Sequence, residues 1–208
     1  MRLLLFGATP GTSGAHVLSQ AVEAGHDVTV VARTPEDVPH RDVVRGDVLH
    51  PETWRAEVAG YDAVLSCLGT RDRRHPATVY SQGAAHIIDA MSEHGVRRLV
   101  CLSSAGLEIP PGTSLPQRLV IKYVIQRLYR HPYADMARME ALVHQSDLDW
   151  TIVRPPMLTD GPLTGTYRHS VDGHLSGARS VSRADLAHYL LHHLDDPSCL
   201  RRTVEISS

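Results

Sequence analysis

Cysteine, phenylalanine and lysine are scarce in this chain of 208 residues, which has three cysteines and one phenylalanine. Its single lysine is Lys122. Cys67, Cys101 and Cys199 lie far apart, and an odd number of cysteines does not suit a disulfide framework. The first two lie in apolar runs, so we expect buried, reduced thiols. Reduced thiols are typical of the cytosol, and we therefore expect a cytoplasmic protein.

Long apolar runs and an excess of one charge are also missing. No run approaches the roughly 20 residues that a membrane-spanning helix needs, and residues 1–6 lead directly into a glycine-rich loop. We therefore expect neither a membrane span nor a signal peptide. The formal net charge of −2 gives no electrostatic case for a nucleic acid or an anionic membrane as a partner. With 42% hydrophobic residues, the chain has the composition of an ordinary globular protein, and its length favours one domain over residues 1–208.

Two kinds of active site lack their signatures. The chain has 14 histidines but no HExxH motif, and His188 and His192 are spaced i, i+4 without nearby cysteine or acidic ligands. We interpret them as helix-surface residues and expect no metal. Ser103 and Ser104 lie in no G-x-S-x-G elbow and have no ordered His–Asp partner, which argues against a hydrolase.

The first 33 residues contain a βαβ pattern. The apolar run 2–6 is followed by Gly7, Gly11 and Gly14, then by a helical stretch over residues 15–24 and a second apolar run over 28–32. Glycines allow a sharp turn and a close approach of phosphate to the main chain. The N–H groups at the start of the helix, near Ser13, attract an anion. This unit therefore predicts a dinucleotide-binding site.

The rest of the chain continues the alternation of strands and helices. Further strands are expected at 42–45, 63–68, 98–102, 150–153 and 203–206, and helices at 51–59, 76–94, 114–130, 132–145 and from 182 onward. The alternation predicts an α/β fold: a Rossmann-like, doubly wound, mainly parallel sheet with helices on both faces. Residues 157–180 are expected to be loops with short strands, and residues of about 105–180 to form the substrate side. The helix at 114–130 could pack on its own sheet or on a second chain.

Candidate site residues follow the strands, because ligands of such sheets bind at the carboxyl ends of the strands. We expect the cofactor to contact Gly7, Thr9, Gly11, Thr12, Ser13, Gly14, Arg33, Asp47, Val48, Leu68, Gly69, Thr70, Ser103, Ser104 and Pro155. Within the loop, Gly11, Thr12 and Ser13 are expected to present N–H groups to the pyrophosphate. Pro10 has no N–H group to offer.

Arg33 ends the second strand. An acidic residue there would bind a ribose 2′-hydroxyl, whereas a guanidinium pairs with a 2′-phosphate. The sequence therefore favours NADP(H) over NAD(H) as the cofactor.

Taken together, these stretches resemble the atypical short-chain dehydrogenase/reductase group, in its NAD(P)H-binding, NmrA-like branch. The closest likeness is to the biliverdin-IXβ reductases, also called NADPH-flavin reductases. Matching segments extend over nearly the whole chain, at residues 5–9, 20–25, 28–33, 46–49, 58–64, 68–71, 162–167 and 182–186. The resemblance implies a single Rossmann-like domain, NADPH as hydride donor and a flavin or similar flat conjugated substrate. It also implies that Ser104 is the catalytic serine beside the nicotinamide and that Arg33 binds the 2′-phosphate.

Three departures from that pattern affect the expected chemistry. The glycine spacing is one residue longer than G-x-x-G-x-x-G. The Tyr-x-x-x-Lys pair of standard short-chain dehydrogenases is absent, because the residue four before Lys122 is Arg118. Two histidine positions of the resembled reductases are Met136 and Met157 here, which puts biliverdin itself in doubt as a substrate. A methionine-lined pocket would still accept many rings, and we expect Tyr133, Met136 and Met157 to contact the substrate.

The sequence thus predicts an NADPH-dependent oxidoreductase that acts on a flavin, a quinone or a natural-product ring, as a monomer or small homo-oligomer. Two alternatives remain open: a non-catalytic NADP(H)-binding redox sensor, and a biosynthetic isomerase or dehydratase on the same fold. In the last case Asp135 or Glu140 would be the base. The sequence favours a simpler role for Asp135, an i, i+3 salt bridge with Arg138 on a helix surface.

Overall fold

A single eight-stranded sheet organises the protein. The computed structural model describes residues 1–70, 72–110 and 112–208. Its main sheet has the order β3-β2-β1-β4-β5-β6-β10-β8, and β7 and β9 form a separate parallel pair. The strands are β1 (Arg2–Phe6), β2 (Asp27–Ala32), β3 (Val43–Arg45), β4 (Ala63–Ser66), β5 (Arg98–Leu102), β6 (Asp149–Arg154), β7 (Met157–Thr159), β8 (Arg168–Val171), β9 (Ser180–Ser182) and β10 (Arg202–Ser207).

The expected doubly wound, mainly parallel architecture is confirmed. Every pairing from β3 through β10 in the main sheet is parallel, and only the edge strand β8 runs antiparallel, against β10. The central strands are buried on both faces, as their continuous apolar runs require: Leu3, Leu4, Leu5 and Phe6 of β1 are each at most 1% exposed.

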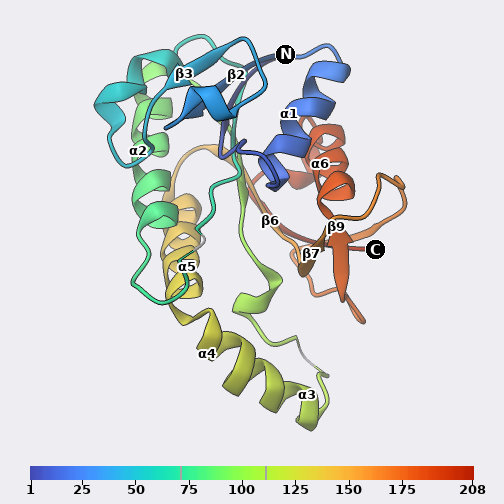
Figure 1. The fold of residues 1–208 in the computed structure, drawn as a ribbon. Helices are drawn as coiled ribbons and strands as arrows, with labels where there is room; N and C mark the ends of the chain where they lie inside the picture. The colour runs from blue at the N-terminus through green and yellow to red at the C-terminus, as the bar shows by residue number, and fades with distance from the viewer. Residues whose placement is uncertain (71, 111) are drawn as a thin grey trace.

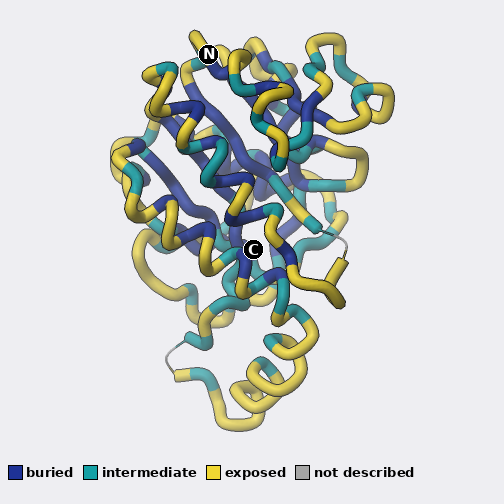
Figure 2. Tube along the Cα trace, turned by 90° about the vertical axis from the view of Figure 1, so that its left-hand side faces the viewer, coloured by how far each residue is buried: buried dark blue, intermediate teal, exposed yellow. Residues whose placement is uncertain are grey.

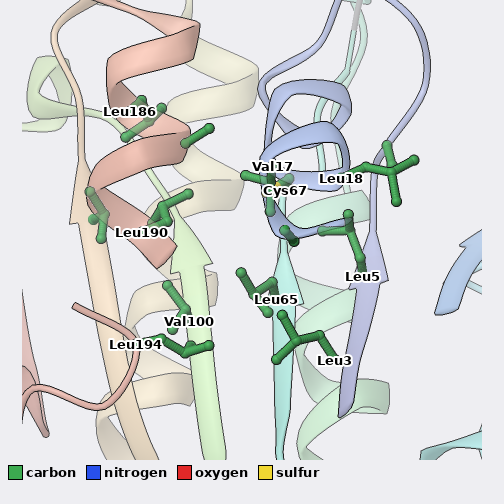
Figure 3. Close-up of a cluster of buried hydrophobic side chains, with 14 of the residues drawn as sticks. Leu3, Leu5, Val17, Leu18, Leu65, Cys67, Val100, Leu186, Leu190 and Leu194 are labelled. Atoms are coloured by element: carbon green, nitrogen blue, oxygen red, sulfur yellow. The ribbon is translucent and has the colours of Figure 1, made fainter. Parts of the chain in front are cut away.

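Two helices cover each face of the sheet. On one face, α1 (Ser13–Glu23) packs beside α6 (Arg183–His192); on the other, α2 (Val79–His94) packs beside α5 (Arg130–Gln145) (Figure 1). Each layer has its own apolar core. Figure 3 shows the α1/α6 core, where Val17, Leu186 and Leu190 lie over Leu3, Leu65 and Val100 of the sheet.

Local signals set several helix ends correctly. The Ser182 hydroxyl accepts a hydrogen bond from the Asp185 amide at 2.9 Å and caps α6, and Gly95 ends α2 with a φ of +72°. The helix expected at 51–59 is wrong, because two 3₁₀ turns, Pro51–Thr53 and Arg55–Val58, replace it. Trp54 separates them with a φ of −148°. Its side chain is 1% exposed, and its indole N–H donates to the Asp47 carbonyl at 2.8 Å.

The helix expected at 114–130 forms, but neither on the sheet nor as one regular α-helix. It comprises α3 (Leu115–Val120), a π-helical turn (Ile121–Ile125) and α4 (Gln126–Leu128), and it projects from the body (Figures 1 and 2). We call residues 115–128 the arm. Among the described residues, no helix combines the length and apolarity that crossing a bilayer demands.

Two glycines allow the strands and the first helix to meet. The chain reverses its winding direction between β1 and β4, and this switch point is where open α/β sheets bind ligands. A Cβ on Gly7, whose φ is +87°, would lie 2.2 Å from the Cys67 carbonyl oxygen. A Cβ on Gly14 would lie 2.4 Å from the Gly7 carbonyl oxygen. Both neighbours are backbone atoms that cannot move aside.

Replacing Gly14 by alanine should therefore destabilise the protein strongly. We expect Gly14→Ala to cost about 3 kcal/mol, because α1 or β1 must shift to relieve the collision. Gly69→Ala is the matched control, since nothing lies within 4 Å of its added Cβ, and it should change stability by less than about 0.5 kcal/mol. Urea unfolding followed by circular dichroism measures both. Equal stabilities would contradict the close approach.

Candidate functional site

The ends of the parallel strands form one edge, as expected. Phe6 pairs with Val31 and Ser66, Ser66 pairs with Cys101, and Leu102 pairs with Val153. The residues that follow these positions therefore come together at the carboxyl edge of the sheet: the glycine loop, Arg33, Leu68–Thr70, Ser103–Ser104 and Pro155. The sheet topology brings most of the predicted cofactor residues into one row.

The glycine loop is fixed by its own hydrogen bonds. The Thr12 hydroxyl donates to the Thr9 carbonyl at 2.6 Å and accepts from the Ala15 amide, which caps α1. The Thr12 amide itself donates to the Thr9 carbonyl oxygen at 3.2 Å. This carbonyl therefore competes with the pyrophosphate that the Thr12 amide was predicted to face. The amides of Gly11, Ser13 and Gly14 have no acceptor within the described part of the chain. In that part they are unpaired donors at the positive end of α1, a position that favours an anion.

Arg33 is exposed directly after β2. Its neighbour Arg45, at the end of β3, pairs with Glu36 and donates to the Arg33 carbonyl at 3.2 Å. No carboxylate partner of the Arg33 side chain occurs in residues 1–70, 72–110 or 112–208. The Arg45 guanidinium is therefore occupied, whereas the Arg33 guanidinium is available to a ligand.

Asp47 and Val48 are turned toward the protein. The Asp47 carboxylate accepts from the Leu49 amide at 3.0 Å and closes a tight turn. Val48 is 6% exposed and packs against the α2 glycine Gly83. These contacts give both residues a structural role, and their contact with a cofactor stays a prediction.

The loop after β4 is held near the same edge. The Thr70 amide donates to the Tyr80 hydroxyl at 3.2 Å, while Gly69 is exposed beside it. Arg71, which follows Thr70 in the matched segment, lies outside the described residues. A dinucleotide passing this loop would meet the exposed backbone of Gly69.

Three hydroxyl groups cluster after β5. Ser104 caps a 3₁₀ turn, η4 (Ala105–Leu107), where its hydroxyl accepts from the Gly106 amide at 3.2 Å. The Tyr133 hydroxyl lies near the Ser104 hydroxyl, and it is so close over Gly106 that a Cβ there would be 2.2 Å away. Ser103 is 5% exposed, and its hydroxyl has no partner among the described residues. An unpartnered buried hydroxyl at this edge fits a site completed by a ligand.

Sequence reasoning missed a stack of side chains behind Tyr133. The Tyr129 and Tyr133 rings stack at 5.5 Å between centroids, and Arg73 lies over the Tyr129 ring at 4.9 Å. Arg73 also donates to the Tyr129 hydroxyl at 2.9 Å. The i, i+4 spacing of the two tyrosines was visible in the sequence, but the contact from Arg73, 56 residues earlier, was not.

Pro155, predicted to contact the cofactor, and the predicted substrate residues Met136 and Met157 are dispersed. Pro155 is buried, and its carbonyl accepts from the Ala105 amide at 3.0 Å, which ties β6 to η4. Met136 packs against the α2/α5 core, whereas Met157, on β7, is 67% exposed. Of the three predicted substrate residues, Tyr133, Met136 and Met157, Tyr133 is the one whose proximity to Ser104 places it directly at the site.

The expected helix-surface salt bridge is wrong in its location. Arg138 pairs with Asp135 at 3.0 Å, but Asp135 is fully buried and also accepts from the Tyr80 amide at 2.9 Å and the Ser81 hydroxyl. It thus satisfies the Tyr80 N–H group at the start of α2. The i, i+3 spacing was read correctly, but the helix turns this face toward α2.

Glu140 is buried as well, at 5% exposure, and its carboxylate accepts two hydrogen bonds from Arg154, one of them at 2.9 Å. This pairing, together with a contact to Glu108, raises the pKa of Arg154. Both candidate bases of the isomerase alternative are therefore buried and already occupied by hydrogen-bonding partners.

A polar cavity of about 350 Å³ lies beside this ion pair, between β6, β10 and the loop after β8. His174 contacts Glu205 at 2.7 Å and Glu108 at 3.5 Å there. The charged side chains that line this cavity thus pair with one another. In the described ranges, no cluster of histidine, cysteine and acidic residues could hold a metal ion. The three thiols are free and buried, and burial raises the pKa of Cys67 and Cys101 to about 12.

Comparison with known proteins identifies the family. Residues 7–197 match the NAD(P)H-binding family. An uncharacterized chloroplastic protein of Arabidopsis thaliana is 31% identical over 176 residues, covering 79% of this chain and 61% of that protein. A 3-diazoavenalumate denitrifying reductase of Streptomyces is 32% identical over 183 residues, covering 81% and 59%. The chain thus spans about three fifths of the length of these two relatives.

Solved structures show the same fold. One, from Streptococcus pneumoniae, is provisionally assigned as an NADH-flavin reductase; it superposes with a TM-score of 0.82 at 20% identity and covers 100% of this chain and 99% of its own. Another, a short-chain dehydrogenase/reductase of Veillonella parvula in complex with NADP, has a TM-score of 0.77 at 20% identity and covers 100% and 94%. The chain belongs to the NAD(P)H-binding family.

Breaking the buried Arg154–Glu140 pair should destabilise the protein. Glu140→Gln leaves a charged guanidinium that is 12% exposed without its main partner, and we expect a loss of about 3 kcal/mol. Glu108→Gln removes the other carboxylate of Arg154, which is 50% exposed, and should cost less than about 1 kcal/mol. Chemical denaturation at pH 7 compares the two. A larger loss for Glu108→Gln would show that the buried pair is not the anchor.

Proposed function

We propose that this protein is an NADPH-dependent oxidoreductase that reduces a flavin or another flat conjugated molecule, such as a quinone or natural-product ring. The observation that carries the proposal is the Ser104–Tyr133 hydroxyl pair, beside the unpartnered Ser103 hydroxyl, at the same sheet edge as the glycine loop. NADPH, when bound, supplies the hydride. The protein binds and orients both reactants and excludes water.

The cofactor site uses backbone donors and one arginine. The available amides of Gly11, Ser13 and Gly14 would bind the pyrophosphate, and the open surface around Gly11 leaves room for it. Arg33 would bind the 2′-phosphate, which distinguishes NADPH from NADH. The family and the NADP-bound neighbour support a nicotinamide cofactor; the preference for NADPH depends on Arg33.

Tyr133 suits the role of a proton donor. Burial raises its pKa, and the nearby Ser104 hydroxyl opposes the shift only in part. The residue four positions later is Ala137, so no lysine on the same helix face stabilises a phenolate. Tyr133 therefore stays protonated at neutral pH, when it can donate a proton but not accept one. That state is suited to protonating a reduced acceptor.

Reductase activity can be tested directly. Purified protein with NADPH and either FMN or menadione should consume NADPH, followed as loss of its near-ultraviolet absorbance. We expect Ser104→Ala to lower kcat/KM about 10-fold or more, and Tyr133→Phe to lower it less for an acceptor that solvent can protonate. Tyr123→Phe, on the exposed arm, is the control. Failure of every flavin and quinone tried would remove this proposal.

Cofactor preference depends on one side chain. We expect Arg33→Ala to weaken NADPH binding about 10-fold, the loss of one charge-assisted pair, and to leave NADH binding within about 2-fold. Arg41→Ala is the matched control, because Arg41 is an exposed arginine in the turn before β3. Fluorescence titration of each reduced cofactor measures both. Equal weakening of NADPH and NADH would exclude a 2′-phosphate contact.

The redox-sensor alternative shares the cofactor site but needs no turnover. Its distinguishing result would be tight NADPH binding with no acceptor reduced. The isomerase or dehydratase alternative is weakened by the buried partners of Asp135 and Glu140, which leave no free carboxylate of either residue at the Ser104 edge.

A further inference from the structure

The arm concentrates apolar side chains on the surface. Among the described residues, 13 large hydrophobic side chains are exposed, and seven of them lie between residues 115 and 128. Leu115 is 77% exposed, Tyr123 60% and Val124 58%; the others are Leu119, Val120, Ile125 and Leu128. In Figure 2 the arm is an almost continuously exposed coil below the buried body. Such a concentration on one protruding element marks an interaction surface.

The arm and the residues that flank it are cationic. Residues 109–134 contain Arg118, Lys122, Arg127 and Arg130 but no aspartate or glutamate. With a net charge of −2 for the whole chain, this segment of +4 leaves −6 for all other residues. In the described structure, none of these four cations forms a salt bridge.

Apolar and cationic residues both recur at four-residue intervals along the arm. Val120, Val124 and Leu128 are spaced i, i+4 and i+8, and Arg118 and Lys122 form a second i, i+4 row. The uncharged Gln126 attaches the arm to the body, where its amide donates to the Gly106 and Leu107 carbonyls at 3.3 and 3.2 Å. The attachment is polar, so the apolar row is left uncovered.

We propose that the arm is a docking surface for an anionic lipid bilayer. Its apolar side chains would enter the boundary between headgroups and acyl chains, and its guanidinium and ammonium groups would contact lipid phosphates. Charge complementarity selects this partner: two copies joined arm to arm would bring the three cations of one arm (Arg118, Lys122 and Arg127) against the same three of the other, whereas an anionic surface neutralises them. The low net charge of the whole chain concealed this local excess.

Vesicle sedimentation tests the proposal with the full chain. Sucrose-loaded vesicles of phosphatidylcholine with 30% phosphatidylserine should pellet the protein at 0.1 M salt. Binding should weaken at least 10-fold with phosphatidylcholine alone or at 0.5 M salt. In the Tyr123→Trp variant, emission should shift to the blue on binding, because the two natural tryptophans, Trp54 and Trp150, are already buried.

Paired variants separate the two contributions. Val124→Ser with Leu128→Ser should abolish binding by removing the apolar contact, and Arg118→Gln with Lys122→Gln should lower affinity at least 10-fold and flatten its salt dependence. Leu163→Ser with Arg41→Gln changes an exposed leucine and an exposed arginine outside the arm and should leave binding intact. Thermal unfolding should be the same for all, since these side chains are exposed.

The proposal fails if vesicles do not pellet the native protein, or if the arm variants bind as well as the native chain. It also fails if sedimentation velocity shows a dimer that Val124→Ser with Leu128→Ser dissociates, because the apolar row would then belong to a second copy. Reductase activity is measured separately in the absence of lipid. Loss of the docking proposal would therefore leave the proposed function standing, and the reverse also holds.

Discussion

The contact between Gly7, Gly14 and the Cys67 carbonyl is the constraint on which the fold and the site both depend. Side chains at the two glycines would approach backbone oxygens to 2.2 and 2.4 Å, so β1, β4 and the start of α1 can meet only if both positions lack a Cβ. This meeting point is also the winding switch of the sheet. Close packing and the candidate phosphate site therefore come from the same two residues.

Buried carboxylates hold the outer layers to this centre. Asp135 binds the start of α2, Glu140 binds Arg154 at the end of β6, and Asp185 accepts from the Thr164 and Gly165 amides at 2.8 and 2.9 Å. Each carboxylate joins segments that are distant in sequence, and each would be costly to leave unpaired. These acidic residues position the elements around the candidate site. Because they are used in this way, the isomerase or dehydratase alternative, which needs a carboxylate base, is weakened.

The candidate chemistry uses few groups. Ser104 and Tyr133 meet because η4 follows β5 directly and α5 returns over it after the arm. The arm is thus an insertion between the two hydroxyl-bearing elements of the site. A surface that docks on lipid would lie next to the substrate side of the protein, which suits an acceptor with an apolar ring system.

Much of the fold and part of the site followed from the sequence by itself. The βαβ unit, the parallel strands, the caps at Gly95 and Ser182 and the row of residues at the carboxyl edge depend on short-range patterns: apolar runs, glycine spacing and the residue after each strand. Arg33 could be named for the same reason, because its position at the end of a strand is local. Family membership was visible in the same segments.

Only the tertiary structure decided which faces are covered. Asp135 has the same sequence spacing to Arg138 whether it faces water or α2, and only the packing of α2 on α5 buries it. The Tyr133 hydroxyl lies near Ser104, which is 29 residues earlier in the sequence. The Tyr129 ring contacts Arg73, which is 56 residues earlier. The arm has an amphipathic pattern that predicts a helix, but the sheet beneath was already covered by other helices. Burial and long-range pairing depend on distances that no local pattern specifies, and the sequence therefore left them open.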